Sequence, residues 1–137
     1  MLVATDFSPG SDAAYWMATE LALRAGALQC RVLHVYCRNF LQSSCASCST
    51  ETRSDEAAEA VRFVREHPVP GVTLIPVVRE CAIVQEAVES VAEASASDLV
   101  VMGRRGSNRL RTALVGSNSA AVLALSARPV LVVPDAA

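Results

Sequence analysis

Glycines, hydroxyl residues and arginines are concentrated in one stretch near the carboxyl end of the chain. Gly103 and Gly106 are separated by two residues, and Gly116-Ser117 follows nine residues later, which gives the pattern G-x2-G-x9-G-S. We expect Gly103 to turn the chain sharply off a strand and Gly106 to bring the backbone close to a ligand. A helix that opens at Ser117 presents main-chain amides to an anion. The stretch is therefore suited to hold a polyphosphate.

The same stretch also has a purely structural interpretation, in which the glycines are turn residues and Ser117 or Asn118 caps a helix. Two observations favour anion binding. Ser119 adds a further hydroxyl, and four arginines lie at positions 104, 105, 109 and 111. Arg104 and Arg105 can neutralise phosphate, although arginines on a loop can equally be solvated. Neither a Walker P-loop nor a dinucleotide fingerprint is present, since G-x4-G-K-[ST] and G-x-G-x2-G are absent.

The composition excludes several classes of protein. Hydrophobic residues make up 52% and charged residues 19% of 137 residues, which predicts a single folded domain over residues 1–137. The chain contains no lysine, so Schiff-base chemistry and other lysine-dependent mechanisms are excluded. A net charge of -2 and an aromatic content of 4% argue against a nucleic-acid-binding surface.

The amino terminus and the least charged stretch bear on localisation. No basic region follows Met1, and Asp6 interrupts the apolar run that a secretory signal needs. Residues 112–127 carry Ser and Asn and fall short of the ~18 apolar residues of a membrane span. We expect a cytoplasmic protein with no membrane partner.

Three of the five cysteines are candidates for a thiol or metal sensor. Cys45 and Cys48 form a C-x2-C pair, and Cys37 lies eight residues upstream of Cys45. Three thiolates can hold zinc, but no second C-x2-C pair supplies the usual fourth ligand. Free thiols in a surface loop over residues 37–52 are the simpler interpretation.

The elements that must position these residues alternate regularly along the chain. Apolar runs without polar alternation predict strands that are buried on both faces of a parallel sheet. The predicted strands are 2–5, 31–36, 72–78, 99–102 and 130–133. The predicted helices are 55–66, 83–95 and 117–126, together with one between the turn at 8–11 and Gly26. In the helix before Gly26, we expect Tyr15 and Trp16 to anchor packing.

This order predicts a doubly wound α/β fold, with a parallel five-stranded sheet and helices on both faces. Ligands of such folds bind beyond the carboxyl ends of the strands, where the strand order reverses. Those ends are Asp6, the segments after Tyr36 and Val78, and the loop after Met102. His34, inside a predicted strand, is expected to be a hydrogen-bonded core residue.

Several segments, taken in chain order, make the sequence resemble the universal stress protein family. They are V-A-T-D-F-S around Asp6, L-H-V at 33–35, D-L-V-V-M-G at 98–103, the glycine pattern, and P-V-L-V-V at 129–133. The resemblance spans the chain and implies the flavodoxin-like, Rossmann-like strand order 3-2-1-4-5. It also implies a homodimer through the last strand, formed by Val130, Leu131, Val132 and Val133. The subgroup of the family with this glycine pattern binds ATP.

The resemblance further implies a role for individual residues. Asp6 and Val35 are expected at the adenosine end with Ala4 nearby, while Met102 and Gly103 flank the ribose. The residues expected to hold the phosphates are Gly106, Ser107, Asn108, Gly116, Ser117, Asn118 and Ser119, with Arg105 beside them. The ligand is ATP, ADP or AMP, and Mg²⁺ is a further candidate. One departure concerns the wall of the site, because the family often has a glycine after the third strand, where this chain has Arg79-Glu80-Cys81.

Two functions remain for this site. The first is a stress-response regulatory module that binds an adenine nucleotide and signals to a protein partner that the sequence does not identify. The second is a slow ATPase or phosphoryl transferase, which needs a general base and metal ligands near the terminal phosphate. The sequence offers Asp6 as the site acid, an acid that can also cap the following helix, and it has no lysine. Binding with little or no turnover is therefore the favoured hypothesis.

Overall fold

Strands and helices alternate in the computed structural model, which describes residues 1–36, 54–105 and 115–135. The strands are β1 (Leu2–Ala4), β2 (Gln29–Tyr36), β3 (Thr73–Glu80), β4 (Val100–Gly103) and β5 (Val130–Val133). The helices within the described ranges are α1 (Pro9–Arg24), α2 (Ser54–Glu66), α3 (Val84–Ala94) and α4 (Ser117–Leu125).

The strands form one parallel sheet in the order β3-β2-β1-β4-β5, which confirms the predicted fold class. The first strand, β1, lies at the centre, where Ala4 pairs with Leu33 of β2 and with Met102 of β4. The helix that follows β1, α1, lies on one face of the sheet, and the helix that follows β4, α4, lies on the other. The strand order therefore reverses between β1 and β4, which is where such folds bind ligands.

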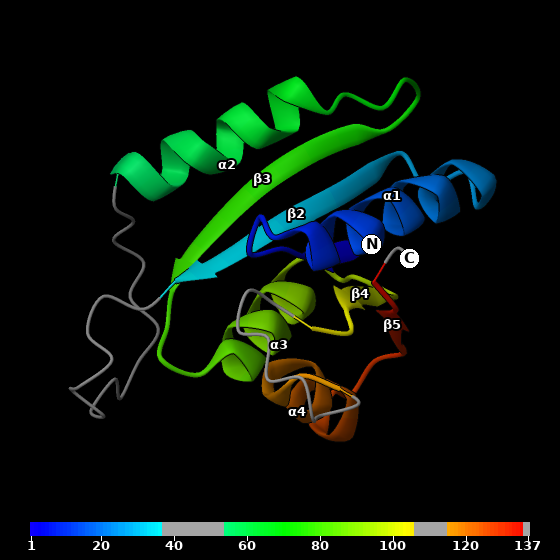
Figure 1. The fold of residues 1–137 in the computed structure, drawn as a ribbon. Helices are drawn as coiled ribbons and strands as arrows, with labels where there is room; N and C mark the ends of the chain where they lie inside the picture. Colours follow the sequence, from blue (N-terminus) through cyan, green and yellow to red (C-terminus); the bar gives the residue numbers. More distant parts are fainter. Residues whose placement is uncertain (37–53, 106–114, 136–137) are drawn as a thin grey trace.

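Helices cover both faces of the sheet, with α1 and α2 on one side and α3 and α4 on the other (Figure 1). Side chains alternate along each strand, so each strand contributes to both layers. On β1, for example, Val3 packs with α1 while Leu2 and Ala4 pack with α3. Two layers of core therefore hold the ends of the central strands in fixed positions.

The strands of one half of the sheet differ from their predicted bounds. β2 and β3 pair over eight residues each, from Gln29 opposite Thr73 to Tyr36 opposite Glu80. The sequence predicted shorter strands because Gln29 and Glu80 are polar, and polarity weakens the apolar signal at the strand ends. β1 is shorter than predicted and stops at Ala4, because the turn begins at Thr5.

Of the two aromatic residues predicted to anchor α1, one does so. Tyr15 is fully buried, and its hydroxyl donates to the carbonyl of His67. Trp16 contacts Tyr15 and His67 through ring edges, but 50% of it is exposed, so the prediction was wrong for Trp16. The prediction for His34 is confirmed, since both ring nitrogens have hydrogen-bond partners.

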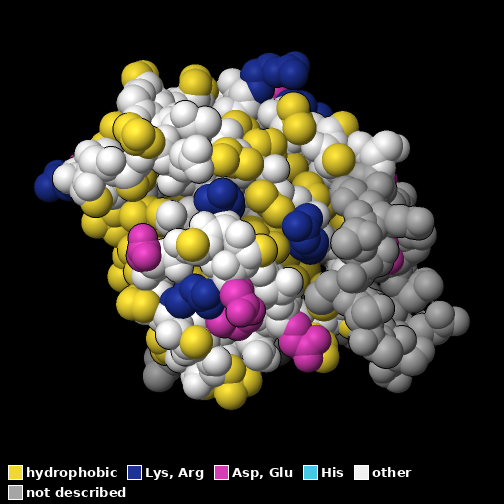
Figure 2. All heavy atoms as spheres, turned by 180° about the vertical axis from the view of Figure 1, so that it is seen from behind, with side chains coloured by type: hydrophobic (Ala, Val, Ile, Leu, Met, Phe, Trp, Pro, Cys, Tyr) yellow, Lys and Arg dark blue, Asp and Glu magenta, His cyan; other side chains and the backbone are white. Residues whose placement is uncertain are grey.

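The surface carries many apolar side chains between its charged ones. On the face shown in Figure 2, hydrophobic side chains are widespread, and arginine and acidic side chains are interspersed among them. Large exposed residues include Leu28, Leu123 and Leu125. A domain this size cannot bury all of a 52% hydrophobic composition. No helix in the described ranges combines the length and the apolar character that crossing a bilayer requires.

Candidate functional site

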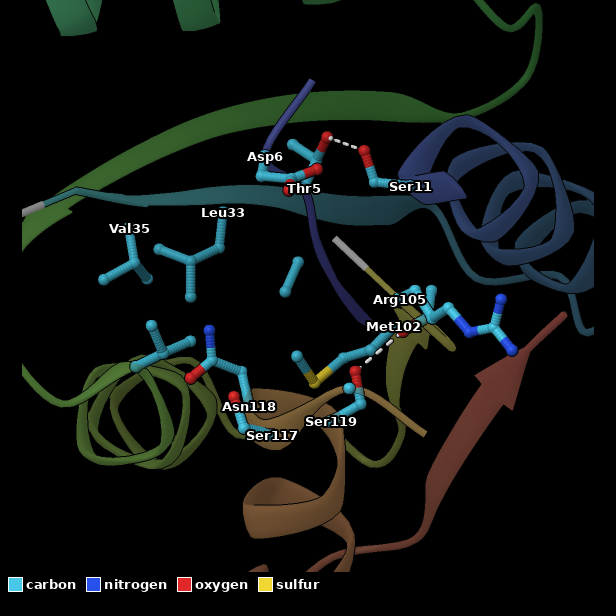
Figure 3. Close-up of a pocket in the computed structure, with 14 residues that line it drawn as sticks. Thr5, Asp6, Ser11, Leu33, Val35, Met102, Arg105, Ser117, Asn118 and Ser119 are labelled. Atoms are coloured by element: carbon cyan, nitrogen blue, oxygen red, sulfur yellow. Dashed lines mark hydrogen bonds between the residues drawn. The ribbon is translucent and has the colours of Figure 1, made fainter. Parts of the chain in front are cut away.

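A cavity of about 230 Å³ opens at the carboxyl edge of the sheet. Its walls come from the ends of β1, β2 and β4, from the turn after β1, and from the first turns of α3 and α4 (Figure 3). The cavity therefore lies at the reversal of strand order, where the sequence predicted a ligand site.

The predicted site residues that the structure describes all line this cavity. They are Ala4, Asp6, Val35, Met102, Gly103, Arg105, Gly116, Ser117, Asn118 and Ser119. The other three, Gly106, Ser107 and Asn108, lie outside the described residues. The structure thus brings together residues from both halves of the chain, while their contacts with a ligand stay predictions.

Four lining residues were missed by the sequence analysis: Thr5, Ser11, Leu33 and Val84. Leu33 could have been found, because it lies two residues from Val35 on the same strand and therefore on the same face. Val84 is the first residue of α3, and its place depends on how that helix packs. The Arg79-Glu80-Cys81 segment, which departs from the family pattern, does not line the cavity.

The sheet side of the cavity is apolar. Leu33, Ala4 and Met102 come from three adjacent strands and are paired in register. All three point to the same face, and Val35 continues this surface along β2 (Figure 3). Ala4, which has a small side chain, lies at the centre of this wall between the larger side chains of Leu33 and Met102. Such a wall suits a flat apolar group such as a nucleobase.

The turn after β1 holds its own polar side chains in a network. Asp6 Oδ1 accepts hydrogen bonds from the amide and the hydroxyl of Ser8. The Thr5 hydroxyl oxygen accepts the amide of Phe7 at 3.0 Å and lies 2.9 Å from the hydroxyl of Ser11. Phe7 has a φ of 60°, a backbone conformation that is uncommon outside glycine. Asp6 therefore caps the turn and lines the cavity at the same time.

Two glycines bring the start of α1 against the end of β4. A Cβ on Gly103 would lie 2.6 Å from the carbonyl oxygen of Gly10, and a Cβ on Gly10 would lie 2.7 Å from that of Arg105. Gly103 is the last residue of β4 and has no positive φ. The chain does bend directly after this residue, at Arg104 and Arg105, as the sequence predicted, but Gly103 is not required there for a left-handed conformation. It is needed because two backbones pass closer than any side chain allows.

The first turn of α4 faces the cavity with no side-chain cap. Gly116 is the N-cap residue, and its amide donates to the Arg104 carbonyl at 2.7 Å. The buried hydroxyl of Ser119 donates to the Gly103 carbonyl at 2.7 Å, which fixes the helix on the end of β4. The amides of the first helical turn carry the positive end of the helix dipole. An anion in the cavity can therefore accept hydrogen bonds at this end.

Charged groups are few around the cavity in the part of the chain that the structure describes. Arg105 and Asp6 are the charged residues among the described lining residues. His34 lies on the other side of β2, where its ring bonds the Thr5 carbonyl at 3.0 Å and the Glu56 carboxylate at 3.1 Å. The histidine is therefore occupied away from the cavity, which leaves Asp6 as the candidate base and as the candidate Mg²⁺ ligand.

Both cysteines in the part of the chain that the structure describes are buried. Cys30 is fully buried, and this burial raises the pKa of its thiol to about 11, against the opposing charges of the amino terminus and Arg31. Cys81 is also buried. Within residues 1–36, 54–105 and 115–135, no three His, Cys, Asp or Glu side chains are grouped to hold a metal ion. Cys37, Cys45 and Cys48 fall outside those ranges.

Comparison with protein families and curated sequences gives one match. The universal stress protein family model matches residues 1–134. The search of curated proteins found no matching sequence.

Solved structures resemble the chain over nearly its full length. Universal stress protein UspA from Lactobacillus plantarum is 23% identical with a TM-score of 0.75, over 96% of this chain and 94% of that one. A universal stress protein in complex with cAMP is 25% identical with a TM-score of 0.66, over 98% and 96%. A universal stress protein family protein from Arabidopsis thaliana, with AMP bound, is 14% identical with a TM-score of 0.57, over 100% and 93%.

Proposed function

Because the chain belongs to the universal stress protein family, we propose that its cavity binds an adenine nucleotide and that binding makes the protein a stress-response regulatory module. Two similar structures hold such ligands, one cAMP and the other AMP. In this chain we further propose ATP as the ligand, since the glycine pattern places a helix start with uncapped amides at the cavity.

One observation carries the proposal: an apolar wall and the amide end of α4 face the same cavity. Leu33 and Val35 lie at one end of the cavity in Figure 3, and Arg105 lies at the other. The base of a nucleotide fits the apolar end, and its phosphates fit the end near Arg105 and the first turn of α4. The volume of about 230 Å³ lies below the range of about 300–1,000 Å³ for drug-sized ligands. We expect the terminal phosphates to extend beyond the enclosed part.

Binding is a better proposal than turnover for the described lining. A hydrolase must orient a water molecule and hold a metal ion near the terminal phosphate. Asp6 is the acidic residue among the described lining residues, and one of its oxygens already accepts two hydrogen bonds from Ser8. We therefore expect hydrolysis of ATP with Mg²⁺ no faster than about one event per minute, far below the enzyme median of ~10 s⁻¹.

Calorimetric titration of Gly116→Val tests the nucleotide proposal. A valine at the N-cap places a branched side chain beside the amides of α4, so we expect ATP binding to be abolished and the helical content to be retained. Ala120→Val is the control, because it adds a similar side chain to the exposed side of the same helix, away from the cavity. Equal ATP affinity in the wild type and in Gly116→Val would contradict the proposal.

We also propose that two copies associate through β5, the strand at one edge of the sheet. The carbonyls of Pro129 and Val133 accept the amides of Val100 and Arg104, so the backbone groups of Val130 and Val132 face the open edge. β5 is entirely apolar. β3, the other edge, carries Pro76 at an outward-facing position, which blocks pairing with another strand. The difference supports β5 as the edge that pairs.

Val132→Pro tests this association, because it gives β5 the protection that Pro76 gives β3. The substitution removes an outward amide and no hydrogen bond to β4. We expect light scattering to show a dimer for the wild type and for the control Val132→Ile, and a folded monomer for Val132→Pro. A wild-type monomer at all concentrations would contradict the proposal.

A further inference from the structure

A pair of arginines at the end of β4 faces an acid that follows β5. Arg104 Nη2 lies 3.6 Å and Arg105 Nη1 lies 4.0 Å from Asp135 Oδ2. The amide of Arg104 also donates to the carbonyl of Val133, the last residue of β5, at 2.7 Å. The backbone of β5, which ends two residues earlier, thus holds Asp135 beside the two arginines.

These ionic contacts leave hydrogen-bonding capacity unused. Both distances exceed the 2.7–3.2 Å of an N–H···O hydrogen bond. In the part of the chain that the structure describes, the Nε atoms of both arginines and Oδ1 of Asp135 are buried without a hydrogen-bond partner. Desolvated donors without partners are costly. An anion that accepted these donors at hydrogen-bond distance would therefore be a better partner than Asp135.

The Arg105 side chain lies between Asp135 and the cavity. Arg105 lines the cavity, and Figure 3 shows its guanidinium directed away from the cavity centre, toward the end of β5. The side chain is partly exposed, with a relative accessibility of 27%, so its torsions have room to change. Phosphate oxygens bound at the first turn of α4 would compete with Asp135 for the same guanidinium.

We propose that Asp135 is a specificity-determining residue, which competes with the phosphates of the bound nucleotide for Arg105 and so lowers the preference for ATP over less charged adenine ligands. This inference rests on the proposed function. It adds a coupling between the ligand and β5: a triphosphate draws Arg105 from Asp135, whereas adenosine leaves the pair intact.

The test is titration of the full chain with adenosine, AMP and ATP, for the wild type and Asp135→Asn. Partly exposed ion pairs of this length have modest strength, so we expect Asp135→Asn to bind ATP about two- to fivefold more tightly and adenosine with unchanged affinity. The control Asp98→Asn makes the same charge change at an exposed residue just before β4, at the amino ends of the strands and so away from the cavity. It should leave the ratio of ATP to adenosine affinity unchanged.

Arg105→Gln gives an independent arm of the same test. It should weaken ATP but not adenosine, and Asp135→Asn should have no further effect in that background. Equal changes for adenosine and ATP, or weaker ATP binding by Asp135→Asn, would overturn the inference while nucleotide binding stands. If the wild type binds none of the three ligands, the proposed function fails first and the inference fails with it.

Discussion

The two sides of the sheet differ most at the end of β2. Leu33 and Val35 point into the cavity, whereas His34 points to the side covered by α1 and α2. There the polar groups satisfy one another, since His34 joins the Thr5 carbonyl to Glu56 of α2. On the cavity side, Leu33 and Val35 border a cavity of about 230 Å³, which the first turn of α4 also lines.

Aromatic side chains pack together on the side of the sheet that α1 and α2 cover, which we call the filled side. Phe63 contacts both Phe7 and Tyr15, with ring centroids 5.2 and 5.1 Å apart, and stacks on His67 at 4.4 Å. The cavity side has aliphatic and small residues at the corresponding level. The comparison teaches that one side of the strand end supplies stability, while the other side keeps space and donors for a ligand.

Tyr15→Ala should have the largest effect on the filled side. Removing this buried ring leaves a cavity among Phe63, Trp16 and His67, so we expect the free energy of unfolding to fall by about 3–5 kcal/mol. Urea denaturation measures it. Trp16→Ala is the neighbouring control and should cost clearly less, because half of that side chain is exposed. Equal losses for both variants would break the comparison.

Val35→Trp, on the cavity side, should affect ligand binding more than stability. The indole would occupy space in the cavity, so we expect ATP affinity to fall more than about tenfold, with a smaller change in stability than a substitution in a filled core produces. Isothermal titration and thermal melting measure the two quantities. Val61→Trp on the exposed face of α2 is the control. Unaltered affinity in Val35→Trp would place the ligand elsewhere.

Alkaline pH should lower the stability of the folded chain through two buried groups of the filled side. Burial raises the pKa of Tyr15 from 10.0 to about 12 and that of Cys30 from 9.0 to about 11. The unfolded chain therefore loses these protons first, and stability is retained below pH 9 and falls between pH 9 and 12. The slope for each group is at most about 1.4 kcal/mol per pH unit. Tyr15→Phe should flatten the decrease above pH 10, and an unchanged slope would contradict the assignment.

Ser11→Ala should have the smallest effect, because Ser11 lies at the boundary of the two sides. Its hydroxyl donates to the Ser8 carbonyl at 2.9 Å and lies at the same distance from the Thr5 hydroxyl. Losing it should cost about 1–2 kcal/mol of stability and change ATP affinity less than threefold. A large loss of affinity in a stable variant would mean that Ser11 contacts the ligand.

The sequence predicted the fold and many lining residues, for reasons that can be stated. Apolar runs separated by helical spacing define a parallel sheet, and the sheet fixes which strand ends meet. Contacts between distant segments could not be predicted in this way. The close approach of Gly10 to Gly103 depends on how α1 meets β4, and the pairing of Asp135 with Arg104 depends on where β5 ends.

The roles of the side chains in the turn after β1 could not be predicted from the sequence either. Asp6 was predicted from its place after β1, but its bonds to Ser8 require the conformation of Phe7, whose positive φ no apolar pattern reveals. Val84 lines the cavity because α3 begins at this residue, beside the cavity. Periodicity locates elements well, whereas the details of turns and helix starts depend on tertiary packing.

A crystal structure of the chain grown with excess ATP tests the central claim most directly. We predict the adenine against Leu33 and Val35, and phosphate oxygens at hydrogen-bond distance from the main-chain amides of the first turn of α4. An empty cavity, with those amides bonded by their own side chains and ATP absent or bound elsewhere, would contradict it.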